Sequence, residues 1–451
     1  MNVSFFRELL DSIVDRSRAL TTLTLGGNGA HGDALELGRQ LLSRRGESSG
    51  AILAQRIVMA YERLDDAGKL AFFTMLSSEF MPDTDAVLAA AAAYSNSPSS
   101  STMRALNRAL ESPRQEFFRR LNFAPGGTQA IVRMREDLLR LLKAHPELRP
   151  VDDDIVHLFG SWFNRGFLVL RRIDWSTPAD ILEKIIQYEA VHEINGWDDL
   201  KRRLDPRDRR CYAFFHPSLV DDPLIFVEVA LVRDIPGSID GLITAEAAIS
   251  AEDPNTAVFY SISNCQKGLA GISFGNFLIK QVVTDLAREI PSLKTFVTLS
   301  PVPGFRAWLD GERHREDSQI LTPSEISTLS VLDQEDWQNN PEWMKLLKPL
   351  LCELAAHYFL REKRANGQPL DPVARFHLGN GARLERINWP GDLSPRGIAQ
   401  AAGLMVNYLY DLKDIEKNHE AYAEHGKVVA SPTVMKLAKT PRSKRLPVPA
   451  S

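Results

Sequence analysis

The sequence has few of the features that mark secreted, membrane-spanning or nucleic-acid-binding proteins. Its 3 cysteines, Cys211, Cys265 and Cys352, lie far apart and form no CxxC pair. Such sparse thiols fit a reducing compartment, and we expect them to be free and mostly buried. The chain contains no run of about 18 apolar residues that could span a membrane. Its net charge is −4, from 54 basic and 58 acidic residues, so the chain lacks the overall positive charge that is typical of nucleic-acid-binding proteins.

Neither end of the given sequence carries a recognisable targeting signal. The first residues are helix-like rather than a signal peptide, and the final Val-Pro-Ala-Ser is not a peroxisomal signal, so we expect a cytoplasmic protein. A hydrophobic fraction of 44% and a charged fraction of 25% are those of an ordinary globular protein. The length of 451 residues predicts about two or three domains.

Residues 1–171 are predicted to form a helical N-terminal domain, because apolar residues recur there at three-to-four spacing. Two of the predicted helices span 103–121 and 129–144, and a hinge at 145–154 leads into a third at 155–170. The charges on the outer faces are mixed, which is typical of a solvated surface. We therefore assign this domain a role in packing or oligomerisation.

After Arg172 the pattern changes to that of an α/β domain, residues 172–451. A helix is expected to begin at Thr177-Pro178, with the threonine hydroxyl as its cap. The elements that follow are a polar helical insertion at about 309–350, a separate helix at 351–364 and a basic tail at about 436–451. β-branched and aromatic runs predict strands at 211–215, 224–232, 257–262, 295–299 and 384–389, in an antiparallel or mixed sheet.

Three segments of this domain have the residue types of a functional site. Ser300 follows a short apolar strand and precedes Pro301 and Pro303, where α/β proteins often place ligand-binding side chains. A glycine-rich loop then lies between the strand at 257–262 and a helix at 277–288, and its backbone N–H groups suit a diphosphate. Finally, His377 lies among apolar residues, and histidine readily shuttles protons near neutral pH. Each residue could equally have a structural role: Ser300 could satisfy a turn and His377 could be a hydrogen-bonded core histidine.

The order of strand, glycine loop, helix and strand resembles the acyl-CoA-binding core of GNAT-type acetyltransferases. Over residues 173–410 the chain further resembles the malonyl-CoA decarboxylase family in several unrelated motifs that occur in order. These motifs are Glu189-Ala-Val-His192, Phe259-Tyr-Ser-Ile-Ser-Asn264, Gly268-Leu-Ala-Gly271, Leu299-Ser-Pro-Val-Pro-Gly-Phe305, Pro372-Val-Ala-Arg-Phe-His-Leu378, Arg386-Ile-Asn-Trp389 and Gly403-Leu-Met-Val-Asn-Tyr408.

The resemblance implies an α+β protein with a GNAT-like catalytic domain behind the helical domain, in a homo-oligomer such as a dimer or tetramer. It implies that malonyl-CoA is converted to acetyl-CoA and CO₂ with no metal or prosthetic group, the CoA moiety belonging to the substrate. Ser300 and His377 would be the catalytic pair, within hydrogen-bond reach of each other, and Tyr410 would support them. The substrate-binding residues would be Ser300 and His377 together with Ala270, Gly271, Ile272, Ser273, Phe274, Gly275 and Asn276.

The loop departs from the family pattern at one position. Animal members carry a glutamate in a Gly-Val-Glu-Leu-Gly version of the loop, where this chain has Ser273, so no role of that carboxylate transfers here. For the chemistry, we expect loop N–H groups to stabilise the enolate oxygen and Phe305 and Phe376 to form apolar walls. Either His377 or Ser300 could deliver the proton. The alternatives are a GNAT-type acyltransferase, a Ser-His hydrolase and a non-catalytic CoA-binding protein.

Overall fold

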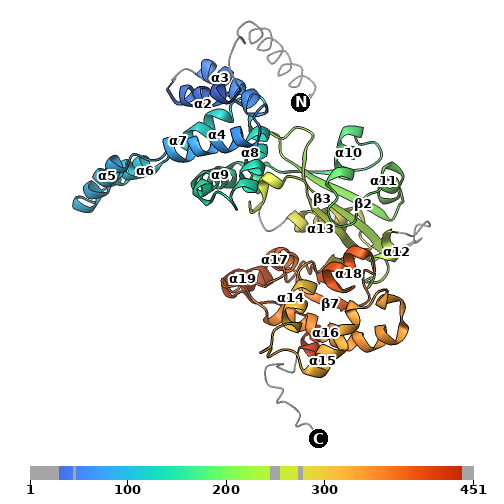
Figure 1. Ribbon diagram of the computed structural model, residues 1–451. Helices are drawn as coiled ribbons and strands as arrows, with labels where there is room; N and C mark the ends of the chain where they lie inside the picture. The colour runs from blue at the N-terminus through green and yellow to red at the C-terminus, as the bar shows by residue number, and fades with distance from the viewer. Residues whose placement is uncertain (1–29, 44–46, 244–253, 273–277, 439–451) are drawn as a thin grey trace. The chain divides into compact units, whose positions relative to one another are not determined.

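The computed structural model describes residues 30–43, 47–243, 254–272 and 278–438 (Figure 1). Contacts within the chain divide it into two compact units. The first extends to Val169 and takes in two short later segments, Phe215–Asp222 and Gln266–Phe274. The second comprises Leu170–Phe214, Pro223–Cys265 and the chain from Gly275 onward. In the described part of the chain, no helix is both long and apolar enough to cross a membrane.

The first unit is built from helices around an aromatic core. Phe72, Phe73, Phe117 and Phe118 are fully buried, and neighbouring rings among them pack edge-on or tilted with centroids 5.4–6.1 Å apart. Helices α5 and α6, by contrast, bury none of their side chains. The α-helices are α2 (Ala30–Ser43), α3 (Glu47–Tyr61), α4 (Asp66–Glu79), α5 (Thr84–Asn96), α6 (Ser100–Leu110), α7 (Pro113–Leu121), α8 (Gly127–Leu141) and α9 (Arg149–Trp162).

The helix predicted over 103–121 is wrong, because the chain breaks into α6 and α7 at Ser112-Pro113. Pro113 begins α7, and Ser112 before it is extended, with φ −71° and ψ 141°. A residue that precedes proline is sterically driven out of the helical region, which explains the break.

The predicted hinge at 145–154 and helix at 155–170 are also wrong. Helix α9 already begins at Arg149, and it contains the acidic residues that suggested a hinge. Asp152 accepts a hydrogen bond from Arg135, and Asp154 accepts one from Arg114, each at 2.7 Å with both partners buried. These aspartates therefore tie α9 to α8 and α7, which sequence composition alone did not reveal.

The second unit contains a mixed sheet, as predicted, but it has eight strands rather than the five that were predicted. Its order is β1-β2-β3-β4-β5-β8-β6, and β7 also pairs with β8. β4 and β5 are parallel, whereas the pairs β3–β4, β5–β8, β6–β8 and β7–β8 are antiparallel. The strands are β1 (Val169–Ile173), β2 (Arg209–Phe215), β3 (Pro223–Val232), β4 (Thr256–Asn264), β5 (Thr295–Thr298), β6 (Ser300–Pro301), β7 (Arg383–Asn388) and β8 (Met405–Leu409).

The parallel pair β4–β5 is joined through α13, which confirms the predicted order of strand, loop, helix and strand. The core on one face of the sheet includes Val258, Tyr260, Val297, Leu299 and Met405. The α-helices of this unit are α10 (Ala179–Tyr188), α11 (Trp197–Leu204), α12 (Asp240–Ile243), α13 (Leu278–Glu289), α14 (Phe305–Arg313), α15 (Pro323–Leu329), α16 (Pro341–Arg361), α17 (Pro372–Gly379), α18 (Pro395–Ala401), α19 (Ile415–His425) and α20 (Pro432–Leu437).

Two local predictions in this unit need correction. The helix expected at 351–364 is the second half of α16, which runs through Pro349 because a row of buried residues on its inner side, including Leu347, Leu351 and Leu354, anchors both halves. Thr177 does not cap α10. Its Oγ1 accepts the N–H of Asp174 at 3.0 Å instead, and Pro178 occupies the capping position.

Candidate active site

Ser300 lies where two neighbouring strands of the sheet part. β5 runs between β4 and β8 up to Thr298, but Ser300 in β6 pairs only with β8, opposite Val406. The sequence therefore placed Ser300 correctly at the end of a strand, although the chain continues in the same sheet. The side chain is buried, with 5% of the residue exposed.

His377 is brought to Ser300 by the short helix α17. Asp371 caps this helix by accepting the N–H of Ala374 at 2.8 Å, and Pro372 occupies its first turn. His377 lies in the last turn and is 3% exposed. Its ring stacks on Tyr408 of β8, with centroids 4.5 Å apart and planes 24° from parallel. Packing thus fixes the plane of the imidazole.

The two residues singled out by the sequence are in contact. Ser300 Oγ and His377 Nε2 lie 3.1 Å apart, although 77 positions separate them in the chain. The predicted hydrogen-bond reach of this pair is confirmed, whereas its catalytic role stays a prediction. Tyr410, predicted as a supporting residue, has its hydroxyl 2.8 Å from His377 Nδ1, so both ring nitrogens have partners.

Burial sets the protonation states of this group. Desolvation lowers the pKa of His377 to about 3, so the imidazole is neutral at physiological pH. It also raises the pKa of Tyr410, which therefore keeps its proton. The carboxyl of Asp371 has a pKa raised to about 6 by burial, against the opposing effect of backbone N–H donors. His377 and Tyr410 are therefore neutral hydrogen-bonding groups at physiological pH, whereas the carboxyl of Asp371 loses its proton above about pH 6.

The pair faces a cavity of about 260 Å³ between the end of β4 and helix α17. Most of its walls are apolar, and Phe376 is among them as predicted. Phe305, also predicted to form a wall, instead packs against Trp308 and Tyr358 at 5.7 Å. The residues that line the cavity are Val191, Phe259, Tyr260, Ile262, Asn264, Leu299, Ser300, Pro301, Pro372, Val373, Phe376 and His377.

The glycine loop is described only in part. Ala270, Gly271 and Ile272 belong to the first unit, and Gly271 has a φ of +77°. The predicted substrate contacts Ser273, Phe274, Gly275 and Asn276 lie outside the described residues.

The segment before this loop is fixed to helix α8. Arg135 donates to the carbonyl oxygens of Gly268 and Ala270 at 2.7 and 2.8 Å. A Cβ on Gly268 would lie 1.9 Å from the carbonyl oxygen of Val132, so only glycine fits there. Gly268 therefore serves the close packing of two backbones.

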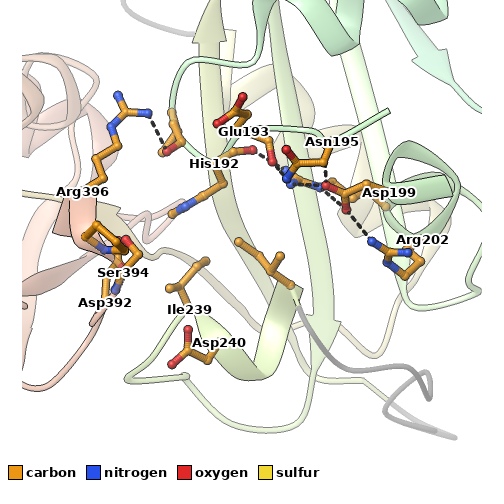
Figure 2. Close-up of a pocket in the computed structure, with 14 residues that line it drawn as sticks. His192, Glu193, Asn195, Asp199, Arg202, Ile239, Asp240, Asp392, Ser394 and Arg396 are labelled. Atoms are coloured by element: carbon orange, nitrogen blue, oxygen red, sulfur yellow. Dashed lines mark hydrogen bonds and ion pairs between the residues drawn. The ribbon is translucent and has the colours of Figure 1, made fainter. Parts of the chain in front are cut away.

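A second cavity, of about 730 Å³, shares Val191 with the first, and most of the residues that line it are polar or charged (Figure 2). Figure 2 shows the ring of His192 directed towards Asp392 and Ser394. Burial lowers the pKa of His192 to about 4, and its Nε2 has no hydrogen-bond partner among the described residues. Glu189 anchors the preceding turn, because it accepts the N–H groups of Val191 and His192. Sequence reasoning assigned no role to these residues.

Two further residues of the Ser300 environment escaped the sequence analysis. Thr298 is fully buried, and its Oγ1 lies 2.8 Å from Ser300 Oγ. Tyr408 forms the surface on which His377 stacks. The position of Thr298 two residues before Ser300 on an extended segment was the available signal, since such residues share one face.

Known families match nearly all of the chain after residue 80. Residues 80–163 match the malonyl-CoA decarboxylase N-terminal domain, and residues 166–447 match the malonyl-CoA decarboxylase C-terminal domain. The chain belongs to the malonyl-CoA decarboxylase family. The family resemblance inferred from the motifs is therefore confirmed.

Individual members of the family are similar over most of their length. The chain is 40% identical to the mitochondrial malonyl-CoA decarboxylase of Anser anser anser over 343 residues, which are 70% of this chain and 68% of that protein. Identity to the mitochondrial enzyme of Mus musculus is 37% over 346 residues, with 71% and 70% covered.

Solved family structures share the fold. The malonyl-CoA decarboxylase of Rhodopseudomonas palustris superposes with a TM-score of 0.88 at 57% identity, covering 91% of this chain and all of that one (100%). That of Agrobacterium vitis gives 0.86 at 54% identity, with 90% and 99% covered. The predicted fold class, helices followed by an α/β domain with a mixed sheet, is confirmed.

Proposed function

We propose that this protein decarboxylates malonyl-CoA to acetyl-CoA and CO₂, using Ser300 and His377. The observation that carries the proposal is the 3.1 Å contact between these two side chains at the wall of a largely apolar cavity. Family membership supports the reaction class, because the relatives from goose and mouse are named malonyl-CoA decarboxylases.

The reaction breaks the bond between the malonyl Cα and its carboxylate. The electron pair of that bond moves into the thioester, giving an enolate and neutral CO₂. An apolar lining such as Leu299, Val373 and Phe376 favours this step, because charge leaves the carboxylate and neutral CO₂ needs no hydration. The enolate oxygen needs hydrogen-bond donors, and we assign these to backbone N–H groups of the loop at 270–276.

A proton must then reach the enolate carbon. A neutral His377 holds one ring proton, and its Nε2 faces Ser300, so the pair can supply that proton directly from His377 or through the hydroxyl of Ser300. Tyr410 holds the other ring nitrogen in place. No step in this scheme requires a metal or a prosthetic group. We further expect a homo-oligomer in the cytoplasm.

The test is incubation of the purified full chain with malonyl-CoA in the presence of a chelator, with CoA species and CO₂ followed by mass spectrometry. We expect acetyl-CoA and CO₂ in equal amounts. Ser300→Ala and His377→Ala should each slow the reaction by about 10²-fold or more, because each removes part of the proton-delivery pair. His157→Ala, which changes an exposed histidine, is the matched control and should leave the rate unchanged.

Other outcomes would identify a different function. Free CoA without acetyl-CoA would indicate a hydrolase, and acyl transfer to an added amine would indicate an acyltransferase. Binding of CoA without any turnover would leave a non-catalytic CoA-binding protein. Loss of activity on chelation, with recovery on adding a divalent metal, would contradict the metal-free scheme.

A further inference from the structure

Thr298 is the second side chain, besides His377, that contacts the hydroxyl of Ser300. It is fully buried at the end of β5, and its Oγ1 accepts two hydrogen bonds. One comes from the backbone N–H of Tyr408 at 3.1 Å and the other from the hydroxyl of Ser300 at 2.8 Å. The Asn407 side chain donates to the Thr298 carbonyl oxygen at 2.7 Å, which fixes the backbone beneath the hydroxyl.

The number of protons that these side chains carry determines which of them donates each hydrogen bond. A serine hydroxyl has one proton, and that of Ser300 is donated to Thr298. Towards His377 the Ser300 oxygen can therefore only accept, so Nε2 carries the ring proton. A neutral imidazole has a single N–H, which leaves Nδ1 as an acceptor for the Tyr410 hydroxyl. Each side chain thus donates to the next one: Tyr410 to His377, His377 to Ser300, and Ser300 to Thr298.

We propose that Thr298 is a positioning residue, which holds the Ser300 proton and thereby keeps His377 in the tautomer with its proton on Nε2. This inference rests on the proposed decarboxylation for its consequence, although the tautomer itself is a property of the resting protein. Thr298 touches neither substrate nor reacting atoms in this scheme, because it acts through Ser300.

The direction matters because Tyr410 and His377 both donate towards Ser300, whose side chain lines the cavity. Once the C–C bond has broken, the Ser300 hydroxyl turns away from Thr298 and gives its proton to the enolate carbon. Ser300 takes the Nε2 proton of His377, and Nδ1 takes the Tyr410 proton. Tyr410 regains a proton from water, so one malonyl-CoA carboxylate and one proton give acetyl-CoA and CO₂. In the reverse order, with Ser300 donating to Nε2, the pair would be arranged as a nucleophile and base.

Replacing Thr298 by valine keeps the shape but removes the acceptor. The only remaining partner for the Ser300 proton in this group is Nε2 of His377, so the ring should change to the tautomer with its proton on Nδ1, donating to Tyr410. Thr298→Ser is the control, because it removes the methyl group of the side chain but keeps the hydroxyl that accepts the Ser300 proton.

The experiment is ¹⁵N NMR of histidine-labelled full-length protein, with the His377 signals assigned by their loss in His377→Gln. We expect a proton on Nε2 in the wild type and in Thr298→Ser, and on Nδ1 in Thr298→Val. A wild-type ring with its proton on Nδ1 would overturn the inference, even if the valine variant failed to fold. An unchanged tautomer in a folded valine variant would also overturn it.

Kinetics provide the second measurement. Thr298→Val should lower kcat for malonyl-CoA by about 10²-fold, the usual size of a proton-transfer contribution, with little change in KM, whereas Thr298→Ser should stay near the wild-type rate. Equal rates for valine and serine would contradict a positioning role. If the wild type showed no decarboxylation at all, the proposed function would fail while the NMR result still tested Thr298.

Discussion

The neutrality of His377 makes the stability of the protein depend on pH in a defined direction. Burial lowers the pKa of this histidine from 6.5 to about 3 in the folded state. Between these two values the unfolded chain binds a proton that the folded protein does not. Stability contributed by the neutral ring is therefore complete above pH 6.5 and is lost as the pH falls from 6.5 towards 3.

The size of the effect follows from the difference between the two pKa values. At about 1.4 kcal/mol for each pH unit, the full difference amounts to about 5 kcal/mol in the free energy of unfolding. About 2 kcal/mol of this should already be lost between about pH 7 and pH 5. Asp371 acts in the opposite sense, because its pKa is raised to about 6 and its protonation stabilises the folded state as the pH falls. The pH dependence of the wild type alone therefore does not separate the contribution of His377 from that of Asp371.

The assay compares urea unfolding of the wild type and His377→Gln at both pH values. Glutamine does not titrate, and Asp371 is present in both proteins, so the wild type should lose about 2 kcal/mol more stability on acidification than the variant. His157→Gln controls for removal of an exposed histidine. Equal pH dependence in wild type and His377→Gln, or an NMR titration of His377 near pH 6.5, would refute the reasoning.

Three further results are expected. Tyr410→Phe leaves a buried Nδ1 without a donor, so thermal unfolding should show a loss of about 1–3 kcal/mol together with slower decarboxylation; unchanged stability would contradict the hydrogen bond. Gly268→Ala should cost about 1–3 kcal/mol because its Cβ meets the Val132 backbone, whereas Gly311→Ala, in open space, should not destabilise. Light scattering should show an oligomer, and Leu88→Glu should weaken it, because Leu88 is an exposed apolar residue of α5. A monomeric wild type would contradict this expectation.

The sequence alone determined most elements of the second unit, because their signals are local. β-branched and aromatic runs predicted five of its strands, β2 to β5 and β7, whereas β1, β6 and β8 were not predicted as strands. Ser300 and His377 were also identified from the sequence, through motifs combined in order rather than through any single one. A lone serine after a strand or a lone histidine among apolar residues would have remained ambiguous.

Local signals failed where a distant partner decided the outcome. Asp152 and Asp154 look like a solvated acidic turn until Arg135 and Arg114 are brought to them by packing. Pro349 looks like a helix boundary, yet buried leucines on both sides keep α16 continuous. In both cases tertiary contacts outweigh a local preference, which sequence composition does not register.

For the site, the sequence supplied the residue types, and the tertiary structure supplied the contacts between them and the direction of their hydrogen bonds. Only the fold brings Ser300 within 3.1 Å of His377, places Tyr410 on the far ring nitrogen and sets Thr298 beneath the serine. Only burial lowers the pKa of the histidine, since desolvation depends on the surrounding packing and not on the neighbouring residues in the sequence. The order of donors, and with it the path of the proton, is therefore a property of the folded protein alone.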